Sequence, residues 1–232
     1  MKKQIFLVAA VLFTAGVITM SGCKKDDTTP PVITLVGSAS VTSVLNAAYT
    51  DQGATANDNK DGDITSKITS TGWIAADKDL TGTYTITYSV TDAAGNTGTA
   101  TRTVIVKNDA EAAYAGTYTS AMETDANGPY TYQTAKPFIV TASTTVNNRV
   151  IMNRLGDFDN NTVYMMVTGT TLTIPSQTVT NVGSGTASCD VHDRQTDGTG
   201  VKTANGFNLT YNDAKVAPCT GTRTGVQAVF VK

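Results

Sequence analysis

The sequence predicts an all-β protein: a β-sandwich followed by a second antiparallel domain, which is either a β-barrel or another sandwich. Threonine and glycine are abundant in the 232 residues, whereas strong helix formers are sparse. Short alternating runs recur along the chain, each bounded by Gly, Asn or Asp, which is typical of sandwiches and barrels. The clearest run, GTYTITYSVTD at residues 82–92, alternates strictly and predicts a strand with one buried face.

The first 22 residues have the layout of a cleaved secretory signal. Two lysines stand near the start, an apolar run spans residues 5–20, and the small residues Ser21 and Gly22 follow. The run is shorter than the roughly 20 apolar residues that a helix needs to span a membrane. We therefore expect residues 1–22 to be a signal peptide.

A cysteine follows this leader directly, in the order Met20, Ser21, Gly22, Cys23. This order resembles the lipobox of bacterial lipoproteins, with Met20 in place of the usual leucine. The resemblance implies cleavage before Cys23, a diacylglycerol group on its sulfur and an acyl chain on its new amine. Two or more acyl chains hold a protein on a membrane stably, whereas one does not. A secreted protein with a chance cysteine and an uncleaved helical anchor are the alternatives.

Residues 23–30 are then the lipidated cysteine and a polar linker. The run from Lys24 to Asp27 resembles the surface-export signal of Bacteroidetes lipoproteins, which implies the outer membrane with the protein facing the medium. A plain solvated linker has the same composition.

The charge of the chain argues against nucleic acid as a partner. Residues 1–22 hold two basic residues and no acidic ones, so the rest has 15 Lys and Arg against 19 Asp and Glu, a formal net charge of −4. No basic block is present that could grip a phosphate backbone. The expected partners are the membrane, through the lipid, and a glycan or a surface protein.

Two further cysteines, Cys189 and Cys219, stand 30 residues apart. An exported protein folds in an oxidising compartment, so we expect a disulfide between them, closing a loop worth on the order of 3 kcal/mol. A metal site of Cys189, His192 and Cys219 is the rival, but it would need reduced thiolates outside the cytosol. Two free buried thiols are the third alternative.

The first predicted domain covers residues 31–106. VITLV at residues 32–36 reads as its first strand. The strand at 82–92 is followed by the turn DAAGN, where Gly95 can take a positive φ, and by a returning strand at 97–107. This hairpin is the strongest local signal in the chain.

Four segments of this domain, PPVITLVG, YTDQGATANDNKDGDIT, GTYTITYSVTDAAGN and TRTVIV, resemble the Ig-like domains of bacterial surface proteins. These modules occur in adhesins and at the N-termini of Bacteroidetes lipoproteins. The resemblance implies a seven-strand-type β-sandwich comparable with the Ig architecture. It implies no enzymatic activity and a role as a spacer or an interaction domain.

The stretch NDNKDGD at residues 57–63 places several carboxylates in one loop, and carboxylates are the ligands that calcium prefers. The EF-hand pattern fails here, because the glutamate it requires would fall on Ile68. A hydrophilic turn with local Asx hydrogen bonds accounts for the stretch, so we expect no metal. A calcium ion shared with Asp51 or Asp92 is the alternative.

The second predicted domain covers residues 112–232, after the short polar connector KNDAE. A new β pattern begins at AYAGTYTS, and six further segments alternate or run apolar. These are FIVTAS (138–143), RVIMNRL (149–155), TVYMMVTG (162–169), TLTIPSQTV (171–179), GFNLTYND (206–213) and GVQAVFVK (225–232). Gly169 marks a tight hairpin. Roughly eight such strands predict a barrel or sandwich, and a barrel of that size is filled or holds one small ligand.

The order GTYTS, VIMNRLGDF, NTVYMMVTGTTLTIPSQTV and GFNLTY resembles the C-terminal β-domains of Bacteroidetes surface lipoproteins. The segment VTGTTLTIPSQ at 167–177 is its most telling part. Such domains often occur near outer-membrane glycan-uptake systems. The resemblance implies a lipocalin-like or related β-fold and an extracellular position, and it carries over no site residue.

The chain offers little for catalysis, and we expect neither an enzyme nor a cofactor. Its single histidine, His192, lies in a polar, Gly-rich segment that reads as a loop, and no G-x-S-x-G elbow accompanies it. Glycoside hydrolysis needs two opposed carboxylates, whereas the only glutamates are Glu111 in the connector and Glu123 beside a predicted loop. Phosphate-loop and H-E-x-x-H motifs are absent.

Non-catalytic binding is the function that remains, with a glycan as the leading ligand class. Tyr130 and Tyr132 in NGPYTYQ are the candidate ligand-binding residues, and Trp73 is a further candidate, because sugars stack on aromatic rings. Both tyrosines share one face of an extended segment, so the alternative to ligand binding is that they pack on the barrel. For Trp73 the alternative is a place in the core of the sandwich. An adhesion or assembly module that contacts another protein is the competing function.

Overall fold

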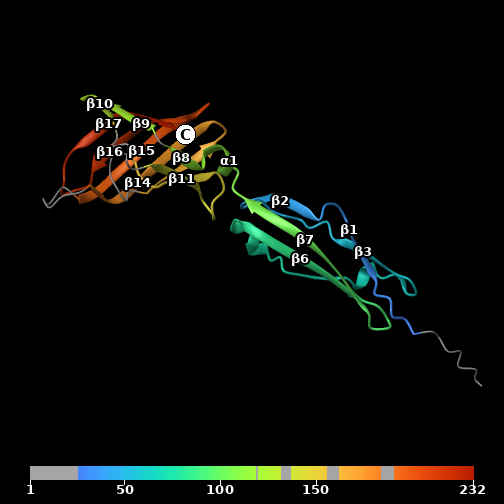
Figure 1. Cartoon of the computed structure of the whole chain (residues 1–232). Coiled ribbons are helices and arrows are strands. Elements are labelled where there is room, and N and C mark those ends of the chain that lie inside the picture. The colour runs from blue at the N-terminus through green and yellow to red at the C-terminus, as the bar shows by residue number, and fades with distance from the viewer. Residues whose placement is uncertain (1–25, 119, 132–136, 156–161, 184–190) are drawn as a thin grey trace, which may run out of the picture.

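Two groups of strands make up the chain, and together they confirm the all-β prediction. The computed structural model describes residues 26–118, 120–131, 137–155, 162–183 and 191–232. A three-stranded and a four-stranded sheet, which we call the N-terminal sheets, precede a ten-stranded sheet, which we call the curled sheet. Figure 1 shows an elongated molecule in which the two groups follow one another and meet near the short helix α1 (Glu111–Tyr114).

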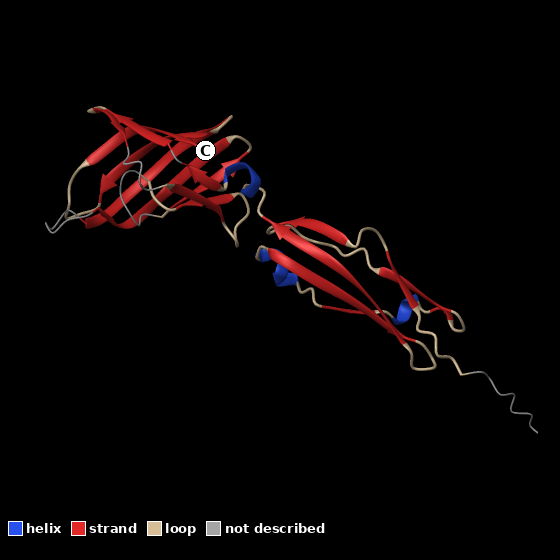
Figure 2. Ribbon diagram, in the orientation of Figure 1, coloured by secondary structure: helices blue, strands red, loops and turns tan. Residues whose placement is uncertain are grey.

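The N-terminal sheets pack against each other as a sandwich of seven strands, the number that the resemblance to Ig-like domains implies (Figure 2). One sheet has the order β1 (Val32–Leu35), β3 (Ala54–Asp58), β4 (Gly62–Asp63), and the other has the order β2 (Ser40–Val44), β7 (Thr97–Lys107), β6 (Gly82–Thr91), β5 (Thr69–Thr71). Two 3-10 turns interrupt the strands: Thr65–Lys67 lies between β4 and β5, and Ala75–Asp79 lies between β5 and β6. Ile33 and Leu35 of one sheet pack on Ile86 and Val104 of the other.

The hairpin of β6 and β7 forms the long axis of this sandwich, as the sequence predicts. The two strands pair in register from Gly82 opposite Val106 to Thr91 opposite Thr97. The side chains of Ile86, Tyr88 and Val90 are buried, and Gly95 closes the turn with a φ of +94°. The strict alternation of the sequence therefore gives the strand its buried face.

Arg102 on β7 ties the loops of the sandwich to its centre. Its side chain is buried and forms an ion pair with Asp51. Its Nη2 donates to the carbonyls of Val36 at 2.5 Å and Gly53 at 3.1 Å, and its Nε donates to the carbonyl of Ser38 at 3.0 Å. A buried charge is tolerated only when it is paired and hydrogen-bonded, and this guanidinium is both.

The connector between the two groups is held by Asn108, which is buried. Its Oδ1 accepts hydrogen bonds of 3.0 Å from the backbone N–H groups of Ala110 and Asn148. Its Nδ2 donates to the carbonyls of Ser143, Val146 and Arg149, at 2.9–3.1 Å. The loop at residues 143–149 therefore wraps around the connector, so that the groups are joined by a bonded contact as well as by the chain.

The curled sheet is antiparallel throughout. Its order is β10 (Gly128–Thr131), β9 (Ser120–Asp125), β17 (Thr222–Val231), β16 (Gly206–Lys215), β15 (Val191–Thr203), β14 (Thr171–Gly183), β13 (Val163–Thr168), β12 (Arg149–Met152), β11 (Phe138–Ala142), β8 (Gly116–Tyr118). Only residue 119 separates β8 from β9 in the sequence, although they pair at opposite sides of the sheet. The sheet therefore curls back on itself, and Lys232 at the end of β17 donates to the carbonyl of Ala115, next to β8.

One continuous apolar core fills the inside of the curled sheet. Aromatic rings form its centre. Phe207 stacks on Phe230 with ring centroids 4.8 Å apart, and Phe138 and Tyr118 approach these two rings edge-on at 5.1 Å and 4.9 Å. Such pairs add to the free energy that burial of the rings provides. The apolar positions that the sequence marks in this region are therefore its core.

One prediction about this region is wrong: the segment around His192 is part of the long strand β15 and not a loop. Glu123 is a buried residue of β9, close to the turn at residues 126–127, as expected from its place beside a predicted loop. The inward positions of β15 hold Arg194, Thr196 and Gly198 in place of apolar residues, so the period-two apolar signal of a strand is missing.

The membrane anchor that the sequence predicts lies outside the described residues, as do the leader and Cys23. In the part of the chain that the structure describes, no helix is long and apolar enough to cross a membrane.

Candidate functional site

The end of the curled sheet that lies away from α1 gathers charged side chains, and we call it the distal end. Neighbouring strands are antiparallel, so β9 and β16 end there while β15 and β17 begin there. Figure 1 shows α1 and the C-terminus at the opposite end of the sheet. The charged residues of the distal end are Glu123, Asp125, Arg154, Arg194, Asp213 and Arg223.

Five of these residues form a charge ladder that alternates in sign across four strands. Arg194 on β15 forms an ion pair with Asp213 on β16, which is the register partner of Arg223 on β17. Arg223 donates through Nη2 to Glu123 Oε2 at 2.8 Å and through Nε to Asp125 Oδ2 at 3.0 Å. Opposite charges on neighbouring strands stabilise a sheet, and pairing is what makes their burial tolerable.

Two members of the ladder, Arg223 and Asp125, stabilise each other's charged forms. Burial alone would lower the pKa of Arg223, but the hydrogen bonds and charges of Glu123 and Asp125 raise it above its ordinary value. The backbone N–H of Asn127 lowers the pKa of Asp125, and Arg223 adds to that effect. Arg223 and Asp125 are therefore ionised at neutral pH.

Arg154 stands apart from the ladder, just beyond the end of β12. Its side chain is only 3% exposed, and its guanidinium lies over the ring of Phe138, 4.1 Å from the ring centroid. Its Nε, Nη1 and Nη2 are buried and have no hydrogen-bond partner in the part of the chain that the structure describes. A buried guanidinium with five unused N–H donors is costly, and a planar anion that accepts two of them would complete its bonding.

An open acceptor lies at the same end. Glu123 is buried, and its Oε2 takes the hydrogen bond from Arg223, while its Oε1 has no partner among the described residues. An unused carboxylate oxygen can accept a hydrogen bond from a polar ligand.

One of the two predicted ligand residues belongs to this end of the sheet. Tyr130 lies on β10, where it is the register partner of Glu123. Tyr132 lies outside the described residues. Trp73 packs edge-on against Tyr49 and Tyr84, at centroid distances of 5.1 Å and 5.5 Å, and adjoins the core of the N-terminal sheets.

The predicted disulfide is described at one of its two cysteines. Cys219 is buried and disulfide-bonded. Cys189 lies outside the described residues, so the pairing of these two cysteines stays a prediction. A thiol that is held in a disulfide is not available as a metal ligand, which speaks against the alternative site of Cys189, His192 and Cys219.

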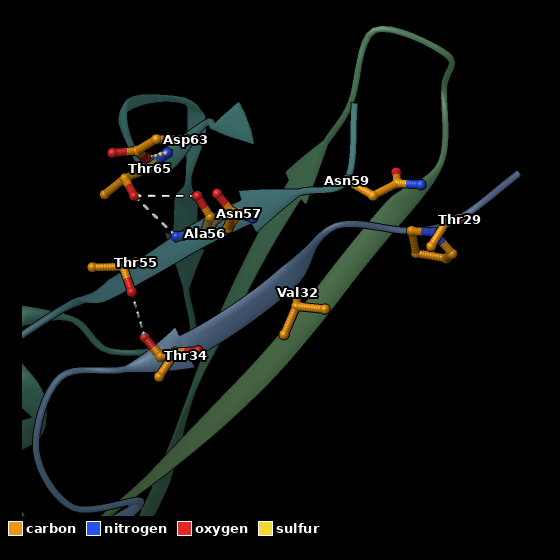
Figure 3. A pocket seen from close by; sticks show the side chains of 10 residues that line it. Thr29, Val32, Thr34, Thr55, Ala56, Asn57, Asn59, Asp63 and Thr65 are labelled. Atoms are coloured by element: carbon orange, nitrogen blue, oxygen red, sulfur yellow. Dashed lines mark hydrogen bonds between the residues drawn. The ribbon is translucent and has the colours of Figure 1, made fainter. Parts of the chain in front are cut away.

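A hollow of about 530 Å³ lies on the N-terminal sheets beside β1 and β3 (Figure 3). Small polar side chains line it, together with the exposed Val32. Thr65 Oγ1 already bonds to the N–H and carbonyl of Ala56, and Thr55 Oγ1 bonds to the carbonyl of Thr34. Because these groups are satisfied, the hollow is a weaker candidate than the distal end.

Arg154 was not predicted as a binding residue, although the sequence contains a signal for it. Val150, Met152 and Arg154 are spaced by two residues, so an arginine continues the buried phase of a strand. A charged residue at a strand position whose alternate neighbours are apolar and buried indicates either a buried ion pair or a binding group. The ladder had no comparable signal, because its members come from distant parts of the chain.

Comparison with known proteins identifies one part of the chain. Residues 33–106 match the family model described as bacterial surface protein, Ig-like domain, which confirms the resemblance seen in the sequence. No curated protein matches the chain. This protein therefore carries an Ig-like domain of the bacterial surface type.

Solved structures give distant matches over more of the chain. A lipoprotein from Bacteroides thetaiotaomicron matches with 15% identity and a TM-score of 0.33, covering 87% of this chain and 100% of that one. A structure of CBM51-2 in complex with GlcNAc and INT domains from Clostridium perfringens ZmpB matches with 16% identity and a TM-score of 0.29. The match covers 87% of this chain and 44% of the longer Clostridium chain.

Proposed function

We propose that this chain is a lipid-anchored, non-catalytic glycan-binding protein of the bacterial cell surface, with its ligand at the distal end of the curled sheet. Residues 31–106 act as an Ig-like spacer domain in this proposal, and residues 112–232 act as the binding domain. The lipid on Cys23 holds the chain on the outer membrane. The distal end is then the part of the protein farthest from the anchor.

The unpartnered guanidinium of Arg154 is the observation that carries this proposal. Three arginines of the chain, Arg102, Arg194 and Arg223, form ion pairs with carboxylates. Arg154 is as deeply buried as Arg102, and none of its nitrogens has an acceptor among the described residues. Bidentate pairing with a carboxylate is the strongest use of such a group, so the favoured ligand is a glycan that contains acidic sugars.

Two features support a binding role over catalysis. Glu111 is exposed on α1, and Glu123 is engaged by Arg223, so the two glutamates do not face each other as hydrolytic carboxylates would. Arg223 and Asp125 stabilise each other's charged forms. Fixed charges of this kind orient a ligand, whereas general acid–base catalysis needs a group that exchanges a proton near neutral pH.

The test is affinity electrophoresis of the full chain in detergent, through gels that contain acidic or neutral polysaccharides. We expect an acidic polysaccharide to retard the protein and Arg154→Met to abolish the retardation. Arg149→Met is the matched control, because Arg149 lies on β12, five residues before Arg154, with its guanidinium over the ring of Tyr164 at 4.5 Å. Equal loss in both variants, or no retardation by any polysaccharide, would contradict the proposal.

The anchor has its own test. Cells that express the full chain should incorporate labelled palmitate into it, and Cys23→Ser should abolish the incorporation. Protease added to intact cells should then degrade the chain if it faces the medium. Retention of the label in Cys23→Ser would contradict lipidation at this residue.

A second candidate function, contact with another protein for adhesion or assembly, is favoured by a different observation. Met122 on β9 and Val229 on β17 are register partners, and their side chains are 49% and 39% exposed. An exposed apolar pair on a sheet suits a protein contact better than a sugar contact. Met122→Ser with Val229→Ser should then abolish capture of a membrane protein in a pull-down and leave polysaccharide retardation unchanged.

A further inference from the structure

Three carboxylates from distant parts of the chain converge at the end of the N-terminal sheets that lies away from the curled sheet. Asp27 precedes β1, Asp58 ends β3, and Asp92 follows β6. One carboxylate oxygen of each lies within 4.8 Å of those of the other two. Asp58 and Asp92 are only 3% and 7% exposed, so two of the three charges have left bulk water.

The loops around these carboxylates hold them in place. The backbone N–H groups of Lys60 and Asp61 both donate to Asp58 Oδ1 at 2.8 Å. Asn96 donates to Asp92 twice, from its backbone N–H to Oδ1 and from its Nδ2 to Oδ2, each at 2.8 Å. The same Nδ2 donates to the carbonyl of Asp27 at 3.0 Å, so one amide bridges two of the three segments.

One acceptor in this cluster is left over. Asp58 Oδ2 is buried and has no hydrogen-bond partner among residues 26–118 and the other described ranges, although Oδ1 of the same carboxylate has two. Among the ion pairs between described residues, none includes Asp27, Asp58 or Asp92. A buried carboxylate oxygen without a donor or a cation is costly, and two more carboxylates beside it increase the cost.

We propose that Asp27, Asp58 and Asp92 bind a calcium ion. All the groups are hard oxygen donors, which Ca²⁺ prefers, and oxygen atoms within 4.8 Å of one another are close enough to share one ion at the distances that Ca²⁺ takes. Mg²⁺ demands shorter distances and a stricter octahedron. The EF-hand comparison could not find this site, because it covers only the loop from residue 57 to 68.

The ion would fasten the N-terminal segment to the sandwich. Asp27 lies four residues after Cys23, so a bound ion would fix the chain almost at its predicted attachment point. It would also cross-link the ends of β3 and β6. This inference goes beyond glycan binding, and it holds whether or not the distal end binds a ligand.

Isothermal titration of the chelator-treated full chain in detergent with CaCl₂ is the test, together with thermal unfolding. We expect a one-site heat and an unfolding midpoint that rises by roughly 5 °C or more in millimolar calcium. Asp27→Asn should weaken calcium binding at least about tenfold, because it removes a charged ligand. Asp26→Asn is the matched control: Asp26 is the exposed neighbour outside the cluster and should bind like the parent chain.

The outcomes separate the alternatives. Asp27 lies before the first strand, so its substitution leaves the fold intact even if Asp58→Asn fails to fold. Neither heat nor a shift in midpoint for the folded parent chain would overturn the proposal. Equal weakening by Asp26→Asn and Asp27→Asn would overturn the assignment of the ligands, and an equal shift with magnesium would overturn the choice of calcium.

Discussion

The side chain of Asn46, in the N-terminal sheets, accepts a hydrogen bond of 2.7 Å from the backbone N–H of Asn147, in the curled sheet, 101 residues away. Its Nδ2 donates to the carbonyl of Thr145 at 3.1 Å, and the N–H of Thr81 donates to the carbonyl of Thr144 at 2.8 Å. The loop between β11 and β12 is thus bonded on one side to the sandwich and on the other to the connector. These bonds restrict how the sandwich can turn relative to the curled sheet.

Asn108→Ala should loosen this joint. The substitution removes the side chain that bonds three carbonyls and two N–H groups, and it leaves those groups buried. We expect the free energy of unfolding to fall by about 2–4 kcal/mol, measured with denaturant. Asn208→Ala, at an exposed position of β16, should change it by less than about 0.5 kcal/mol. An unchanged midpoint for Asn108→Ala would contradict the role given to this residue.

Asp51 should make the stability of the sandwich depend on pH. Burial alone would raise its pKa, but the hydrogen bond from Tyr88 and the charge of Arg102 outweigh burial and lower it. The stabilisation is therefore complete above the unfolded-state pKa of about 3.9 and is lost as the pH falls through the lower folded-state pKa. In urea titrations, the advantage of the parent chain over Asp51→Asn should be largest at neutral pH and shrink below about pH 4. A constant difference across this range would contradict the linkage.

A strand could be predicted from the sequence where its buried positions are apolar. In β6 and β7 the inward residues are apolar, and the pattern located both strands to within a residue or two. In β15 the inward positions hold Arg194 and Thr196, and the strand was missed. The buried Arg194 of β15 is paired with Asp213 on the next strand. A short sequence pattern cannot indicate a partner that lies 19 residues away.

The candidate sites follow the same rule. Tyr130 could be named from composition, because aromatic rings suit sugars wherever they lie. The group of Asp27, Asp58 and Asp92 could not, because the order of the strands, and not sequence spacing, brings these residues together. The sequence suggested Asp92 as a partner of the acidic loop only as an alternative, without a reason to prefer it over Asp51.

Arg223→Met should expose the cost of the buried carboxylates in the charge ladder. It would leave Glu123 and Asp125 without the guanidinium that both now contact. We expect a loss of about 3–5 kcal/mol in the free energy of unfolding, by denaturant titration. Adding Glu123→Gln to this variant should restore part of the loss, because it removes one of the two uncompensated charges. A double variant no more stable than the single one would show that the charges are not the cause.

Gly198→Ala should disturb the inside of the curled sheet. A Cβ at this position would lie 2.7 Å from the Cβ of Tyr211 and 2.5 Å from the carbonyl oxygen of Thr210, so the paired strand must shift. Overpacking of this kind costs about 1–3 kcal/mol. Gly82→Ala on β6 is the control, since its Cβ would make only ordinary contact with the ring of Tyr84 at 3.4 Å. Similar unfolding midpoints for the two variants would contradict the close approach at Gly198.

The pairing of Cys219 yields the last prediction. Non-reducing peptide mapping should find its sulfur joined to Cys189, the cysteine that the exported part of the chain offers once Cys23 carries lipid. Cys219→Ser and Cys189→Ser should each lower the free energy of unfolding by about 3–4 kcal/mol, and the double variant should lose no more, because one bond closes one loop. Additive losses would mean that the two cysteines act separately. In that case each thiol would contribute through its own packing, and no disulfide would join the β14–β15 connection to the β16–β17 connection.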